Sequence, residues 1–268
     1  MIEGVKHIVA VASGKGGVGK STVTVNLALA MVAEGYRVGI LDADIHGPSQ
    51  AQMLGAPEGV RPQQAGENKF RPLEMHGVQA MSMAFMVDTR EPMVWRGPMV
   101  AGAFQQLLTQ TAWKDLDVLF IDMPPGTGDI QLTLAQKVPV DGAVIVTTPQ
   151  DIALLDARKG IEMFRKVNVP VLGVVENMSL HVCSNCGHAE PIFGEGGGER
   201  IASEYETRVL GRLPLALSIR EQADSGRPTV IADPKSEVTS TFRDMARQIA
   251  ETLGGQSPSE GPSISFSD

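Results

Sequence analysis

The feature that most constrains this chain is a glycine-rich octapeptide close to its first residue. Residues 14–21 read GKGGVGKS, which fits the spacing G-x-x-x-x-G-K-[ST], and an apolar run, Ile8–Ala12, shortly precedes it. Glycines let backbone N–H groups turn inward around phosphate oxygens, and a helix that begins there directs its positive end at the same point. A glycine turn with a chance lysine would need neither a strand before it nor a helix after it. The sequence therefore predicts a phosphate-binding loop between a strand and a helix.

This loop supplies both positive charge and a metal-binding oxygen. Lys20 can neutralise the β- and γ-phosphates of a nucleotide, and the Ser21 hydroxyl can bind Mg²⁺. Lys15 is a second lysine that the chain's own nucleotide does not need, so it either reaches a nucleotide on a facing subunit or is a solvated charge. Lys15 and Lys20 are therefore candidate catalytic residues. The residues expected to contact nucleotide here are Gly14, Lys15, Gly16, Gly17, Val18, Gly19, Lys20, Ser21 and Thr22.

Aspartates follow two further predicted strands, in LDADIHGPS (41–49) and FIDMPPGTGD (120–129). In an open parallel sheet, ligands bind beyond the carboxyl ends of the strands. We expect Asp122 to contact Mg²⁺ and Asp42 to support Mg²⁺ through water. Asp44 is the candidate for orienting the attacking water, which phosphoryl transfer requires. One of these aspartates could instead cap a helix, but all three are not expected to do so.

Apolar runs alternate with helical stretches along the chain, which predicts βαβ units with right-handed crossovers. Several runs are continuously apolar, as suits strands covered on both faces. We predict an α/β fold with a doubly wound, mostly parallel sheet of about seven to eight strands and helices on both faces, as in P-loop NTPases. The predicted strands are His7–Ser13, Arg37–Asp44, Val78–Ala84, Asp117–Met123, Gly142–Thr148, Val171–Met178 and Val209–Leu213. The predicted helices are Lys20–Glu34, Pro98–Thr111, Ile130–Gln136, Ile152–Val167, Gly198–Tyr205, Ile219–Ala223 and Glu237–Leu253.

The domain organisation predicted from this pattern is simple. Residues 1–253 form a single P-loop ATPase domain, which carries a Cys-x-x-Cys loop at 181–198. Residues 55–76 are polar and rich in Pro and Gly, so we expect a surface loop there. Residues 254–268 are rich in Ser, Gly and Pro and are expected to form a disordered tail, because they bury too little apolar surface to become ordered.

Charge and hydropathy exclude several classes of function. The chain of 268 residues has 23 Lys and Arg against 31 Asp and Glu, a net charge of −8, which disfavours a nucleic-acid partner. No apolar stretch approaches the roughly 20 residues of a membrane span, and Ile8–Ala12 is too short for a signal-peptide core. The only two cysteines lie too close together to cross-link a secreted fold. We therefore expect a cytoplasmic protein with no membrane or nucleic-acid partner.

The phosphate loop with its extra lysine resembles that of the deviant Walker-A ATPases, relatives of the Min and Par ATPases and of the nitrogenase iron protein. Further motifs, which occur in the same order, narrow the resemblance to the Mrp/ApbC-type iron–sulfur cluster carrier ATPases. It runs from about Val5 to Leu253. Besides the Cys-x-x-Cys, these motifs are DADIHGPS (42–49), WRGPM (95–99), DMPPGTGD (122–129), TTPQ (147–150), ENMS (176–179) and IFGEGGG (192–198).

The resemblance implies an ATP-dependent homodimer that holds a [4Fe–4S] cluster between its subunits. Its implied partners are apo iron–sulfur proteins and a cluster-assembly scaffold. It also implies that Lys15 reaches the partner's nucleotide and that Asn177 contacts adenine, although Asn177 could instead cap a turn. Hydrolysis should be slow, because Lys15 and Asp44 would act only once the dimer closes; Arg96 is a candidate interface residue. Many relatives carry a domain ahead of the phosphate loop, and with only 13 residues before Gly14 we expect that domain to be absent.

Both cysteines lie in the segment HVCSNCGH, 181–188. Tetrahedral zinc and iron–sulfur clusters usually need four ligands, and one chain offers two thiolates, Cys183 and Cys186. A two-fold dimer places like against like, so two chains would supply four. A zinc site completed by His181 and His188 is an alternative, although their spacing is tighter than in zinc fingers. A redox pair is another alternative, although the motif does not open a helix after a strand.

Two other functions remain open for the whole chain. One is a Min- or Par-like positioning ATPase, which would be expected to have a basic amphipathic helix for membranes or a basic surface for DNA. The other is an ATPase with a structural zinc site. The first has no evident use for a Cys-x-x-Cys, and the metal bound by the protein would distinguish the second from a cluster carrier.

Overall fold

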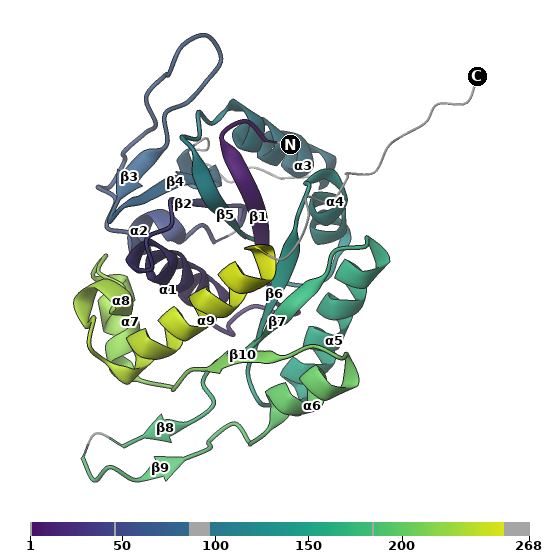
Figure 1. Cartoon of the computed structure of the whole chain (residues 1–268), viewed down its shortest axis with the longest axis vertical. Coiled ribbons are helices and arrows are strands. Elements are labelled where there is room, and N and C mark those ends of the chain that lie inside the picture. The colour runs from purple at the N-terminus through teal and green to yellow at the C-terminus, as the bar shows by residue number, and fades with distance from the viewer. Residues whose placement is uncertain (1, 46, 86–96, 184, 255–268) are drawn as a thin grey trace.

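The central element of the computed structural model, which describes residues 2–45, 47–85, 97–183 and 185–254, is an eight-stranded sheet (Figure 1). Its strand order is β10-β7-β6-β1-β5-β2-β4-β3, and every neighbouring pair is parallel except β3 and β4. The strands are β1 (Val5–Ala12), β2 (Val38–Asp42), β3 (Leu73–Met75), β4 (Val78–Ser82), β5 (Leu116–Asp122), β6 (Gly142–Thr147), β7 (Val171–Glu176) and β10 (Val209–Arg212).

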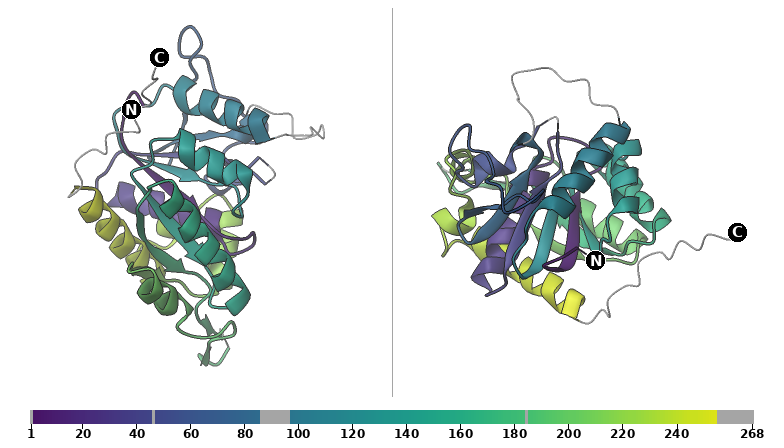
Figure 2. Two further views of the ribbon diagram at one scale, coloured as in Figure 1. Left: turned by 90° about the vertical axis from the view of Figure 1, so that its right-hand side faces the viewer. Right: turned by 90° about the horizontal axis from the view of Figure 1, so that it is seen from above.

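Helices cover both faces of this sheet, as predicted. The longest helices of one face, α1 and α9, pack against each other and the sheet, whereas α3, α4, α5 and α6 cover the opposite face (Figures 1 and 2). The helices are α1 (Lys20–Ala33), α2 (Gln50–Met53), α3 (Gly97–Gln110), α4 (Asp129–Lys137), α5 (Asp151–Lys166), α6 (Gly197–Glu204), α7 (Leu217–Asp224), α8 (Thr229–Ala232) and α9 (Glu237–Gly254), with a 3₁₀ turn at Met83–Phe85.

The strand sequences are continuously apolar because both of their faces are buried. In β5, Phe120 packs into the cluster beneath α1 and α9, while Leu119 and Ile121 pack into the cluster beneath α3, α4 and α5. All five residues of β2 are buried. Each fully buried side chain of this size stabilises the fold by about 1.5–3 kcal/mol relative to exposure.

The parallel register brings the candidate site to one edge of the sheet. β1 lies between β5 and β6, and Val11 pairs with Asp122. Asp42 lies directly opposite Asp122 on β2. The loops that follow β1, β2, β5, β6 and β7 therefore open at the same carboxyl edge, where ligands of such sheets bind.

All seven predicted strands are present, but the prediction of a surface loop over 55–76 was wrong at the end of that range. Leu73–Met75 forms the antiparallel edge strand β3, which pairs with β4. The turn between them consists of His76 and Gly77, both with positive φ, the conformation that two-residue hairpins favour. His-Gly is a weak sequence signal for such a turn, and three residues are too few to show alternation.

Two sequence predictions fall wholly or partly outside the described residues. These are residues 255–268 of the predicted tail and Arg96 of the WRGPM motif. Gly254, where the tail was predicted to begin, is instead the last residue of α9. Within the described residues, no helix combines the length and the apolar character needed to cross a membrane.

Candidate functional site

The phosphate loop joins β1 to α1, and its glycines shape it. Gly17 and Gly19 have φ of 80° and 81°, a left-handed conformation that side chains disfavour. Gly14 meets a different constraint, because a Cβ there would lie 2.0 Å from the carbonyl oxygen of Asp156 in α5. Val18 is buried in the core and holds the middle of the loop. The loop is thus fixed against α5 and the core, whereas Gly16 and Gly17 are exposed.

A cavity of about 500 Å³ opens above this loop. Its walls come from the loop itself, from the segment after β2, from the end of β7 and from α7. The residues around it include Gly16, Gly17, Gly19, Lys20, Ser21, Thr22, Asp44, Met53, Pro125, Asn177, Met178, Pro214, Leu215 and Ile219. Its volume lies within the range of small-molecule and cofactor sites.

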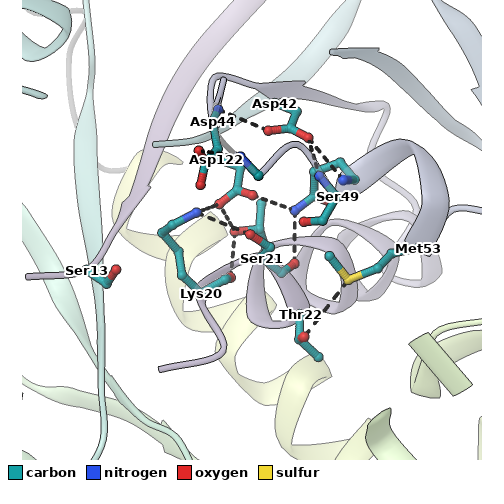
Figure 3. Close-up of polar contacts among 12 residues, drawn as sticks. Ser13, Lys20, Ser21, Thr22, Asp42, Asp44, Ser49, Met53 and Asp122 are labelled. Carbon is teal, nitrogen blue, oxygen red and sulfur yellow. Dashed lines mark hydrogen bonds and ion pairs between the residues drawn. The ribbon is translucent and has the colours of Figure 1, made fainter. Parts of the chain in front are cut away.

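Lys20, which lines the cavity, forms a buried ion pair with Asp122 (Figure 3). Lys20 is 6% exposed and Asp122 is fully buried. The Lys20 ammonium also lies 3.2 Å from the Ser21 hydroxyl. Asp122 accepts further hydrogen bonds from the Thr24 hydroxyl at 3.2 Å and from the Gln50 amide at 2.8 Å. Asp122 thus contacts Lys20, which in turn contacts the Ser21 hydroxyl; that Asp122 contacts Mg²⁺ remains a prediction.

Asp42 lies beside this pair but is held mainly by backbone groups. Its Oδ1 accepts the N–H of Asp44 at 3.1 Å, and its Oδ2 accepts the N–H groups of Ser49 and Gln50, both at 3.0 Å. Burial first, and then the charge of Asp122, raises the pKa of Asp42 to about 7. Its carboxyl group therefore fixes the backbone at Asp44, Ser49 and Gln50, and any contribution to metal binding would be indirect.

Asp44 lines the cavity from that same segment. The N–H of Gly47 donates to its Oδ1 at 3.2 Å, and the side chain is largely buried at the cavity wall. Lys15 lies elsewhere: it is half-buried, its carbonyl accepts the Ser13 hydroxyl at 2.8 Å, and it is not among the residues lining the cavity. The structure therefore brings Lys20 and Asp44 to one cavity, with Asp122 paired to Lys20, and leaves Lys15 outside the cavity wall.

The oxygen atoms of Ser21 and Asp122 fit a hard divalent cation. Mg²⁺ prefers oxygen ligands and is commonly bound through one or two carboxylates together with substrate phosphates. The Ser21 hydroxyl and the Asp122 carboxylate both lie around the Lys20 ammonium. These two side chains are the ones placed to hold Mg²⁺, directly or through water.

Gln50 is a site residue that the sequence prediction missed. Its amide nitrogen donates to the Ser21 carbonyl at 3.0 Å as well as to Asp122, so it joins the phosphate loop to the end of β5. Its Oε1 is buried without a hydrogen-bond partner among the described residues. Gln50 opens the four-residue helix α2, which is too short to show a helical period, so no pattern in the sequence marks it.

The other end of the cavity contains Asn177, immediately after β7. Its side-chain amide donates to the Val18 carbonyl at 2.8 Å, and its backbone N–H donates to Thr147 at 2.8 Å. Asn177 therefore links the phosphate loop to the end of β7. The sequence prediction missed Pro214 and Leu215, which lie opposite after β10, because neither carries a recognisable chemical signal.

The cysteines lie on a small hairpin that the sequence did not predict. β8 (His181–Val182) pairs antiparallel with β9 (Ala189–Glu190), away from the central sheet (Figure 1). At its tip, Cys183 donates its N–H to the His188 carbonyl at 2.9 Å and accepts the Gly187 N–H, also at 2.9 Å. Cys183 is partly exposed and Cys186 is exposed, and both are free thiols.

The local backbone favours the thiolate form of Cys183. Hydrogen bonds from the N–H groups of Asn185 and Cys186, followed by the Cys186 side chain, lower the pKa of Cys183. A thiolate is the form that binds metal. Within the part of the chain that the structure describes, no three His, Cys, Asp or Glu side chains are grouped to hold a metal ion. The Nδ1 atom of His181 lies 3.1 Å from the Leu215 carbonyl. In this arrangement His181 does not join the cysteines in a Cys₂His₂ zinc site.

Comparisons with known proteins show the family to which this chain is similar. A family model described as NUBPL iron-transfer P-loop NTPase, in the ParA group, matches residues 4–250. The iron-sulfur cluster carrier protein of Pseudomonas fragi is 70% identical over 242 residues, which cover 90% of this chain and 84% of that protein. The iron-sulfur cluster transfer protein NUBPL of Mus musculus is 50% identical over 254 residues, 94% of this chain and 79% of that protein.

A solved structure extends the similarity to the fold. The nucleotide-binding protein of Archaeoglobus fulgidus, solved in complex with ADP, superposes with a TM-score of 0.76 at 35% identity. The match covers 90% of this chain and 93% of that one.

Proposed function

The chain belongs to the NUBPL iron-transfer P-loop NTPases of the ParA group, and on that basis we propose that it is an ATP-binding homodimeric carrier of an iron–sulfur cluster. The carried cluster is its cargo, and the recipients are apo iron–sulfur proteins. The observation that carries the proposal is the pairing of a preformed phosphate cavity with a two-thiol hairpin that needs two more ligands. The cargo would come from a cluster-assembly scaffold.

Nucleotide binding is expected to rearrange the Lys20–Asp122 pair. Phosphate oxygens compete with the carboxylate for the Lys20 ammonium, and the loop N–H groups and the start of α1 add further positive potential. Asp122 and Ser21 would then face Mg²⁺, which supplies charge to the phosphates when bound. Asn177, already fixed on the Val18 carbonyl, would contact the adenine.

We expect hydrolysis to be slow, and the positions of the remaining groups support this expectation. Asp44 would orient the attacking water from the cavity wall. Lys15, outside that wall, would act on the nucleotide of the second subunit, so that turnover depends on dimer closure. Few groups then stabilise the transition state in an open monomer, and stabilising that charge is the main task of phosphoryl-transfer enzymes.

Cluster binding would use Cys183 and Cys186 from each of two subunits. Four thiolates complete the shell of a [4Fe–4S] cluster, and the lowered pKa of Cys183 favours its ionised form. Transfer is a ligand exchange in which each iron–thiolate bond to the carrier is replaced by one to the recipient. Because the ligands are divided between two chains, separation of the subunits would release the cluster.

The test is anaerobic reconstitution with iron and sulfide, followed by iron analysis, absorbance spectroscopy and sedimentation. The wild-type dimer should bind about four iron and four sulfide per two chains, the content of one [4Fe–4S] cluster. Cys183→Ala and Cys186→Ala should each abolish this. His188→Ala is the matched control, because it changes the same hairpin without removing a thiolate. If the wild type binds zinc in place of iron, and His188→Ala loses that zinc as well, the site is instead a zinc site within a single chain.

A further inference from the structure

Glu176 is a buried carboxylate that the proposed reaction does not use. It ends β7, is 2% exposed and directly precedes Asn177. Its Oε2 accepts a hydrogen bond from the N–H of Gly198 at 2.6 Å, and the Nε of Arg212 lies 3.8 Å from its Oε1. Burying a carboxylate is costly unless it is paired and hydrogen-bonded, so these contacts determine where Glu176 can lie.

Glu176 and Gly198 bracket the segment that carries the cysteines. The chain leaves β7 after Glu176, forms the hairpin and returns at α6, whose second residue is Gly198. A Cβ at Gly198 would lie 3.1 Å from the Glu176 Oε2, and one at Gly197 would lie 2.9 Å from the Pro149 carbonyl oxygen. The glycines of IFGEGGG thus let the start of α6 approach the ENMS segment. The hydrogen bond from Gly198 to Glu176 joins the two ends of the loop that holds the cysteines, and Gly197 adds a close contact to the Pro149 carbonyl.

The opposite side of the same loop is joined to the nucleotide cavity. Ser179 donates its N–H to the Leu213 carbonyl at 2.9 Å, and Leu215 donates its N–H to the Leu180 carbonyl at 2.9 Å. Leu215 also lines the cavity next to Asn177. A nucleotide that displaces residues 213–215 would therefore act, through backbone hydrogen bonds, on Ser179 and Leu180, which lead directly into β8.

The hairpin also has room to change its position. A second cavity, of about 570 Å³, lies between the hairpin base and the start of α9. Leu180 and Val182 border it on the hairpin side, Arg212 on β10, and Val238 on α9. The hairpin is therefore held by its two ends more than by packing along its length.

We propose that Glu176 is a positioning residue that couples nucleotide binding to the orientation of the cysteine hairpin. With the α6 end fixed on Glu176, a displacement at residues 213–215 changes the angle of the hairpin. When the contact to Glu176 is lost, the start of α6 can move together with residues 213–215, so that the same displacement no longer changes the angle of the hairpin. The inference rests on the proposed function, since it treats the cavity as a nucleotide site and the hairpin as the carrier of the cargo thiols.

Hydrogen exchange of the protein without cluster, with and without ADP and Mg²⁺, tests this proposal directly. In the wild type, nucleotide should slow exchange in the phosphate loop and should also change exchange in residues 179–183 and 185–190 by about threefold or more. In Glu176→Ala and Glu176→Asp, nucleotide should still slow exchange in the phosphate loop but should no longer change exchange in the hairpin. The aspartate is one methylene too short to reach Gly198. Without nucleotide, exchange of the Gly198 amide should rise about tenfold in both variants.

Two further variants separate positioning from general stability. Glu176→Gln keeps an acceptor oxygen for Gly198 and should restore the hairpin response. Glu195→Ala removes an exposed carboxylate that borders the second cavity and should leave the response unchanged. A hairpin response that persists in Glu176→Asp overturns the proposal. The proposal is also overturned if nucleotide slows exchange in the phosphate loop of the wild type but does not change exchange in the hairpin; the nucleotide site is then still supported. If nucleotide does not slow exchange in the phosphate loop of the wild type, the proposed function is contradicted as well.

Discussion

The ammonium group of Lys20 and the carboxylate of Asp122 form a buried ion pair between the start of α1 and the end of β5. Removing one partner of a buried pair leaves the other charge uncompensated, which typically costs about 3–5 kcal/mol. The pair therefore has two roles: it stabilises the empty fold, and it holds Lys20 next to the phosphate position.

Lys20→Ala should lower the free energy of unfolding by about 3 kcal/mol and abolish nucleotide binding. Urea denaturation and titration calorimetry measure the two effects. In an Asp122→Asn background the same substitution should cost less, since no carboxylate is left unpaired. Lys15→Ala is the control and should change stability by no more than about 0.5 kcal/mol. Equal stability of Lys20→Ala and wild type would contradict the buried pair.

Gly14→Ala should damage the site more than Gly17→Ala. At Gly14 the new methyl group would lie 2.0 Å from the backbone oxygen of Asp156, so the loop or α5 must move. A stability loss of about 3 kcal/mol and at least about tenfold weaker nucleotide binding are expected. At Gly17 nothing lies within 4 Å, and only the positive φ opposes the change, at about 1 kcal/mol. Equal losses in the two variants would show that close packing on α5 is not what constrains the loop.

The pH dependence of stability should report on Asp117. This side chain is 21% exposed and accepts hydrogen bonds from Arg37 and from Lys6, at 2.7 Å, which hold its pKa well below the ordinary value of 3.8. The folded state thus binds fewer protons than the unfolded state, so the stabilisation is present above about pH 4 and is lost as the pH falls further. Asp117→Asn should cost about 1 kcal/mol at pH 7.

The difference in unfolding free energy between wild type and Asp117→Asn should shrink as the pH falls from 4 to 2, as measured by denaturant titration at each pH. Asp115→Asn is the matched control, because Asp115 is 83% exposed and lies 3.9 Å from the same guanidinium. A difference that stays constant down to pH 2 would contradict a lowered pKa.

Cys183 should ionise more readily than an unstructured cysteine. The N–H groups of Asn185 and Cys186 lower its pKa, so its thiolate fraction at neutral pH is raised. In the Cys186→Ser variant, the rate of alkylation by iodoacetamide should reach half its maximum at a lower pH than in the same variant unfolded in urea. If the folded and unfolded profiles coincide, the hairpin does not organise the thiol.

The phosphate loop and the strand pattern could be predicted because both are local. Gly17, Gly19 and Lys20 act through backbone conformation and charge within one turn of chain. The burial of the strands on both faces leaves continuous apolar runs. The aspartates could be placed as well, because every parallel strand ends at the same edge.

The missed features depend on contacts between distant segments. Gln50 gains its role from Ser21 and Asp122, 29 and 72 residues away. β8 and β9 have two residues each, which is too short for any period. β3 exists because a turn at His76 and Gly77 brings it back onto β4, and neither its length nor its turn gives a clear signal.

Both borders of the central sheet are short strands. β3 has three residues and β10 has four, whereas β1 in the middle has eight. Few unpaired backbone groups are therefore offered where a foreign strand could add, which disfavours fibre-like growth even in concentrated solution. At the central sheet, copies of the chain would therefore associate through side chains, and such contacts can separate without breaking a series of backbone hydrogen bonds.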